Sequence, residues 1–231
     1  MYTELYDDNH QFIYTKNEWL DSDRIERRSS GEYDSNLLCK KCEHERLSKF
    51  EDYARTVLFG NETKTNLMPI CRNYRNNEGI IYSNWQNIDY TKFKIFLLSI
   101  LWRASISKRD IFSEVNLGIH EELLRKMILD ETPGEVNNYP ILFFGTQSYS
   151  KNFSKIIAQP RKLKQEGRTL YLFFIGGIML LFYISKNKIP QIFTEHTIRP
   201  SNEVDIIQLP KEGIDIWFEK AYGIKNITKV L

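Results

Sequence analysis

Two cysteines three positions apart carry the sharpest chemical signal in this sequence. Cys39 and Cys42 stand in the segment LLCKKCE, and two thiolates on one tight turn supply half of a tetrahedral zinc site. No second Cys-x-x-Cys and no close His-x-x-x-His is present, so we expect a reduced, metal-free pair, with zinc as the one candidate cofactor. Further ligands would come from the same pair in a second copy of the chain, or from Cys71 with one of the histidines, which are His10, His44, His120 and His196.

A short stretch of concentrated positive charge is the second candidate. Between residues 151 and 168, six basic side chains stand against one acidic side chain, Glu166. Such an excess could contact the phosphates of a nucleic acid, whereas the plainer interpretation is a solvated loop between two strands. The six basic residues are Lys151, Lys155, Arg161, Lys162, Lys164 and Arg168.

Trp102 and Arg103 form a third candidate, because an aromatic ring beside a guanidinium can stack on a base or hold a phosphate. An arginine that ends an apolar helix and pairs with a glutamate is the commoner arrangement. Its candidate partners in the sequence are Glu114, Glu121 and Glu122. Glu51 and Asp52, in contrast, are expected on the solvated face of a helix.

The elements that must position these residues follow from the hydrophobic pattern. In the first half of the chain, apolar residues recur at steps of three and four, which is typical of amphipathic helices. Residues 61–88 are rich in asparagine and are predicted to be irregular. The predicted helices cover residues 43–59, 90–105 and 120–131, with a short additional helix from Ser107 to Val115.

After about residue 138 the pattern changes to short runs that are typical of strands. The predicted strands are 139–146, 153–159, 169–175, 178–185, 191–198 and 204–209, and a helix over residues 214–222 follows them. We therefore expect an α+β fold, with a helical N-terminal half followed by a mostly antiparallel β-sheet and a C-terminal helix. We also expect a single domain over residues 1–231, mainly helical over 1–135 and mainly β over 136–231.

The most apolar segment, Leu170–Ile184, has 15 consecutive apolar or glycine residues, which is shorter than the roughly 20 that a membrane helix needs. Gly176 and Gly177 at its centre predict a β-hairpin, because both accept the positive φ of a tight turn. The apolar residues run continuously rather than alternately, so both faces of the two strands should be covered. We expect no membrane-embedded segment.

Composition limits the class of protein. Hydrophobic residues make up 42% of the chain and charged residues 27%, which excludes a disordered or collagen-like protein. A net charge of +2 does not by itself indicate a nucleic-acid or membrane partner. Three cysteines favour a reducing compartment, and the polar, acidic start MYTELYDDNH is unlike a signal peptide. We expect a cytoplasmic protein.

Several segments resemble a family of uncharacterised bacterial proteins related to HNH endonucleases. The marks of the resemblance are the LLCxxCE box, the pair Glu51 and Tyr53, and Ile100-Leu101-Trp102-Arg103 followed by Leu117-Gly118. In the family, a second Cys-x-x-Cys and a Ser-His-Ile-Ile-Pro segment stand further upstream, and the latter supplies the HNH histidine. Neither is present here, although YTELYDD (Tyr2 to Asp8) resembles the stretch that follows that histidine.

The resemblance implies an HNH-derived scaffold with Cys39 and Cys42 as half of a zinc site. Because the histidine that would activate water is absent, we expect a catalytically degenerate protein that binds nucleic acid or a protein partner, in a mobile-element or phage-defence setting. The first alternative is an active metal-dependent nuclease whose N-terminal catalytic segment is missing from this chain. The second is a structural module that forms a homodimer.

Overall fold

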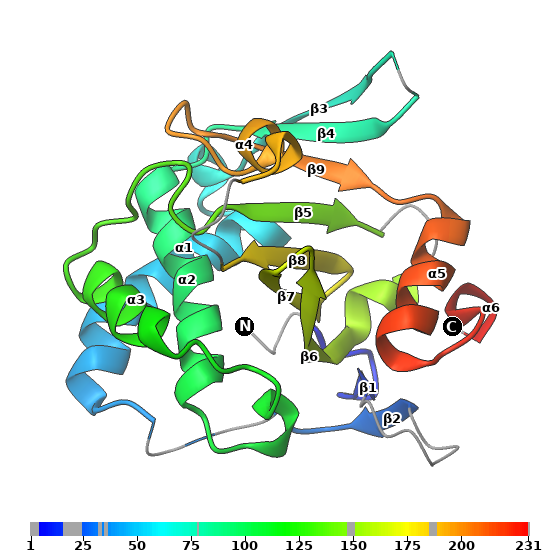
Figure 1. Ribbon diagram of the computed structural model, residues 1–231, viewed down its shortest axis with the longest axis horizontal. Helices are drawn as coiled ribbons and strands as arrows, with labels where there is room; N and C mark the ends of the chain where they lie inside the picture. The colour runs from blue at the N-terminus through cyan, green and yellow to red at the C-terminus, as the bar shows by residue number, and fades with distance from the viewer. Residues whose placement is uncertain are drawn as a thin grey trace.

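The computed structural model describes residues 5–15, 25–31, 34, 37–77, 79–146, 151–184 and 189–230. Its strands are β1 (Phe12–Thr15), β2 (Ile25–Arg28), β3 (Ile70–Arg75), β4 (Ile81–Gln86), β5 (Ile141–Gly145), β6 (Ile156–Gln165), β7 (Arg168–Ile175), β8 (Ile178–Tyr183) and β9 (Glu203–Gln208). They form one nine-stranded sheet in the order β2-β1-β6-β7-β8-β5-β9-β4-β3 (Figure 1). The pairs β1–β6 and β5–β9 are parallel and the other pairs are antiparallel, so the sheet is mixed.

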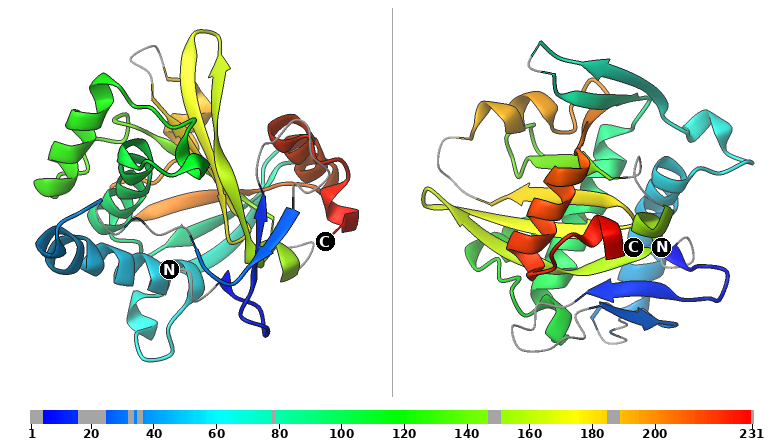
Figure 2. Two further views of the ribbon diagram at one scale, coloured as in Figure 1. Left: turned by 90° about the horizontal axis from the view of Figure 1, so that it is seen from below. Right: turned by 90° about the vertical axis from the view of Figure 1, so that its right-hand side faces the viewer.

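Helices cover both faces of this sheet (Figure 2, left). One face packs against α1 (Ser48–Phe59), α2 (Tyr90–Ile106) and α3 (Ile119–Leu129), and the other against α4 (Gln191–His196), α5 (Lys211–Tyr222) and α6 (Ile227–Val230). Side chains of β7 alternate between the two cores: Tyr171 and Phe173 point to the α2 side, and Leu172 and Phe174 to the α5 side. This explains why the apolar run of β7 and β8 is continuous, since each face has its own core to fill. Shorter helical segments are η2 (Lys41–Leu47), η3 (Thr65–Leu67), η4 (Asp110–Phe112) and η5 (Lys151–Lys155).

The predicted hairpin within Leu170–Ile184 is confirmed. Strands β7 and β8 pair antiparallel from Leu170–Tyr183 to Ile175–Ile178. Gly176 and Gly177 form the turn with φ of 62° and 80°, values that a β-branched residue avoids. Among the described residues, none of the helices has the length and hydropathy that a membrane span requires.

Replacing Gly176 with valine should lower the free energy of unfolding by about 2 kcal/mol. A side chain here must adopt positive φ, and its Cβ would lie 2.9 Å from Leu5 Cδ2. The matched control is Gly167→Val, at the β6–β7 turn, where φ is +72° but no heavy atom lies within 4 Å of the added Cβ. Urea denaturation should show a larger loss for Gly176→Val than for Gly167→Val, and equal losses would contradict the packing argument.

The expected α+β fold with a helical first half is wrong. The first half begins with β1 and β2, and β3 and β4 follow α1, so the sheet draws strands from both halves of the chain, with helices interspersed. Strand β3 (ICRNYR) escapes prediction because it is exposed along its whole length. It therefore has no buried face to give an alternating hydrophobic pattern.

Three local predictions also need correction. The segment predicted as a strand over 191–198 contains α4, whose N-cap is Pro190. Proline has no backbone N–H and is tolerated where a helix starts. The loop expected within residues 151–168 is mostly strand, because β6 runs to Gln165 and turns at Glu166-Gly167. The short helix expected from Ser107 to Val115 is reduced to η4.

Candidate functional site

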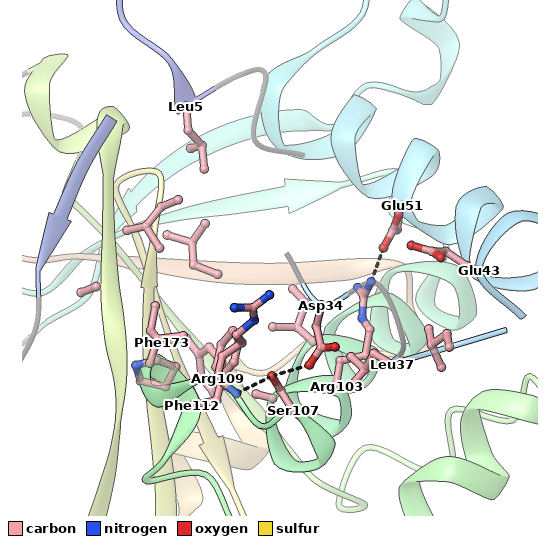
Figure 3. A pocket seen from close by; sticks show the side chains of 18 residues that line it. Leu5, Asp34, Leu37, Glu43, Glu51, Arg103, Ser107, Arg109, Phe112 and Phe173 are labelled. Carbon is pink, nitrogen blue, oxygen red and sulfur yellow. Dashed lines mark hydrogen bonds and ion pairs between the residues drawn. The ribbon is translucent and has the colours of Figure 1, made fainter. Parts of the chain in front are cut away.

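A cavity of about 350 Å³ lies between the sheet and the helices α1 and α2 (Figure 3). One wall is apolar and comes from β6 and β7, with Ile157, Phe173 and Ile175, and from Leu5 at the start of the described chain. The opposite wall comes from α2 and the segment after it. The polar lining residues are Asp34, Glu43, Glu51, Arg103, Ser107 and Arg109. The cavity is thus amphipathic, as ligand sites usually are.

Arg103 is held in place on this cavity by Glu51. Its Nη1 lies 2.6 Å from Glu51 Oε1, and its Nε donates to the Ser99 carbonyl at 3.2 Å. The partners expected from the sequence are therefore wrong, because α1 packs on α2 and brings Glu51, 52 positions away, next to Arg103. The side chain of Glu51 stays 36% exposed, as its place on the solvated face of a helix predicts. The expected partners contact other groups: Glu114 pairs with Arg161, Glu121 accepts from Ser105 and Glu122 pairs with Arg125.

The side chains of Arg109 and Asp34 complete the polar part of the cavity. Arg109 reaches toward the middle of the cavity from the segment after α2 (Figure 3). Asp34 accepts a hydrogen bond of 3.4 Å from Ser107. Sequence reasoning missed both residues, because an isolated aspartate and an arginine beside a lysine are ordinary surface signals.

Some of the residues that carry the family resemblance line this cavity, whereas Tyr53, Leu117 and Gly118 do not. Leu37, Leu38 and Glu43 of the LLCxxCE box line it. So do Glu51 from α1 and Arg103 from the Ile100–Arg103 segment. These marks are spread over more than sixty positions of the sequence, and the packing of η2, α1 and α2 brings them together.

Cys39 and Cys42 lie beside the cavity at the start of η2. The Cys42 N–H donates to Cys39 Sγ at 3.4 Å. Hydrogen bonds from the backbone and thiol of Cys42 hold the pKa of the Cys39 thiol below its ordinary value, and the same thiol contact raises the pKa of Cys42. Cys71 is exposed on β3.

No group of three or more histidine, cysteine or acidic side chains is placed to hold a metal ion in the part of the chain that the structure describes. Zinc binding by Cys39 and Cys42, within one chain or shared by two, stays a prediction.

The six basic residues of the segment 151–168 do not form one uncommitted patch. Lys155 Nζ donates to the Tyr6 carbonyl at 2.8 Å, and the Lys162 ammonium lies 5.9 Å from the centroid of the Tyr171 ring. Arg161 pairs with Glu114 and Arg168 with Glu166. Lys164 is exposed on β6, and the side chain of Lys151 lies outside the described residues. A nucleic-acid role for this segment stays a prediction.

Comparison with protein-family models, curated proteins and solved structures found no match to this chain.

Proposed function

We propose that this protein is a binding component rather than a nuclease. In this proposal, the cavity receives an apolar side chain of a protein partner, together with a neighbouring basic group of the same partner. The observation that carries the proposal is a cavity of ligand size with one apolar wall and several charged side chains. The cavity is lined from three separate segments of the chain, by Leu38, Glu51 and Arg103 among others. Side chains that gather at a cavity of ligand size are what a binding function requires.

The charges around the cavity favour a cationic partner over a phosphate. Three carboxylates line it, from Asp34, Glu43 and Glu51, against the guanidiniums of Arg103 and Arg109. The guanidinium of Arg103 is already compensated by Glu51 at 2.6 Å. A phosphate group would meet this acidic excess, whereas a lysine or arginine beside an aliphatic side chain would match both the carboxylates and the apolar wall.

Filling the cavity should abolish this binding. Ser107 lines the cavity, and Ser107→Phe would place a ring in the space that the partner needs. The probe is an array of immobilised 15-residue peptides of random sequence, screened with purified protein. We expect the bound peptides to be enriched in an aliphatic residue next to lysine or arginine. The affinity of the protein for these peptides, measured by fluorescence polarisation, should fall at least about tenfold in Ser107→Phe.

The matched control is Ser113→Phe, which adds the same ring at an exposed serine outside the cavity lining. It should bind the peptides as the unchanged protein does. Enrichment of acidic peptides, equal binding by Ser107→Phe, or the absence of any enriched motif would each overturn the proposed function.

A further inference from the structure

The hairpin of β3 and β4 extends beyond the body of the protein (Figures 1 and 2). Among the described residues, β3 is the last strand of the sheet and pairs only with β4, and each of its residues is exposed. Exposed large hydrophobic side chains also gather here: Met68, Ile70, Tyr74, Ile80 and Ile81. An edge strand of this kind is a surface on which another molecule can bind.

Two tyrosines form an aromatic surface on this hairpin. Tyr74 and Tyr82 stand opposite each other in the register of β3 and β4. Their rings stack with centroids 5.5 Å apart at 22°. The inner ring, Tyr82, also packs edge-to-face with the His196 ring, with the two ring centroids 5.8 Å apart. The outer ring, Tyr74, is 41% exposed, so it offers an aromatic surface to solvent.

Positive charge lies on the same strand. Arg72 is two residues from Tyr74 and so projects from the same face of the sheet, and Arg75 ends the strand. Neither β3 nor β4 contains an acidic residue. The acidic side chains on β9, the strand beyond β4, are Glu203 and Asp205, and they share the guanidinium of Arg199 at 3.0 Å each.

We infer that Tyr74, Tyr82 and Arg72 form a binding surface for single-stranded nucleic acid. An unpaired base would stack on Tyr74, and Arg72 would contact the adjacent phosphate, a combination that binds single strands with little dependence on sequence. In a duplex the bases are stacked on each other and cannot reach the ring. Pairing of β3 with a second copy is disfavoured, because it would bring four arginines onto two adjacent strands.

This surface is separate from the cavity of the proposed function, so the two can fail independently. The test is the fluorescence anisotropy of labelled single strands of deoxythymidine and uridine, about 12 nucleotides long, titrated with the full chain. Tyr74→Ala should weaken binding about tenfold, since one stacked base contributes about 1–3 kcal/mol. Tyr74→Phe should bind like the unchanged protein, because it keeps the ring. Arg72→Gln should weaken binding and reduce its dependence on salt.

Four further measurements define how the inference would fail. Leu123→Ala, at an exposed leucine of α3, should leave the affinity unchanged. A double variant, Lys162→Gln with Lys164→Gln, tests the β6–β7 hairpin. If it abolished binding and Tyr74→Ala did not, the oligonucleotide would bind the β6–β7 hairpin and the inference would be wrong. Equal affinity for duplex and single-stranded oligonucleotides would also overturn the inference. So would a protein that binds no oligonucleotide but forms a dimer, detected by light scattering, that Tyr74→Ala dissociates.

Discussion

Replacing Asp205 with alanine should lower the free energy of unfolding by about 3 kcal/mol at pH 7, the low end of the range for breaking a buried ion pair. Asp205 on β9 is 5% exposed. It accepts hydrogen bonds from Asn84 Nδ2 at 2.8 Å and from Arg199 Nη1 at 3.0 Å, and His196 Nδ1 also lies 3.0 Å from it. Without the carboxylate, these groups from β4, α4 and the segment after α4 would lose their common acceptor.

The pH dependence of this effect has a definite sign. Burial opposes the ionisation of Asp205, but the hydrogen bonds from Arg199, Asn84 and His196 outweigh it and hold the pKa of the carboxyl below its ordinary value. The stabilisation is therefore present above the ordinary aspartate pKa and is lost as the pH falls through the lowered value. Urea denaturation should show the difference between Asp205→Ala and the unchanged protein at pH 7 and a smaller difference at acidic pH.

Asp52→Ala is the matched control for this comparison, because Asp52 is exposed on α1. It should change the free energy of unfolding by less than about 0.5 kcal/mol. A loss at Asp205 as small as that at Asp52 would show that the cluster does not hold β4, β9 and α4 together.

Replacing Lys94 with methionine should raise the free energy of unfolding by about 2 kcal/mol at pH 6. Lys94 lies in α2 and is 1% exposed. Its Nζ donates to the Glu135 carbonyl at 2.6 Å and to Tyr90 Oη at 2.9 Å, but no carboxylate contacts it within the described residues. Methionine has a similar length and carries no charge to desolvate.

Burial lowers the pKa of Lys94 to about 7, from an ordinary value of 10.5. Between these values the unfolded chain binds a proton that the folded chain does not, so the stability of the unchanged protein should fall as the pH is lowered from 10 to 7. The gain from Lys94→Met should therefore be largest at pH 6 and should decrease steadily as the pH rises toward 10. Thermal unfolding across this range measures it.

An exposed lysine provides the control for Lys94. Lys126→Met on α3 removes the same charge without relieving any burial, and it should leave the pH dependence unchanged. If Lys94→Met destabilised the protein at pH 6, the two hydrogen bonds of Lys94 would outweigh the cost of burying its charge.

Local sequence pattern was enough to predict several elements of this protein. The helix predicted over 90–105 is α2, because its apolar residues recur with a helical period and Asp89 caps it by accepting from the Lys92 N–H. The turn at Gly176-Gly177 follows from the positive φ that two glycines permit. In both cases the decisive interactions join residues only a few positions apart, so the local pattern contains them.

Only the tertiary structure decided the sheet and the cavity. Strands β5 and β9 are parallel neighbours although some sixty residues separate them, and β3 joins the sheet without a buried face. The partner of Arg103 is Glu51 rather than a glutamate close in sequence. Such contacts depend on how α1, α2 and the sheet pack, and a one-dimensional pattern records the burial of each residue but not the identity of the residue that covers it.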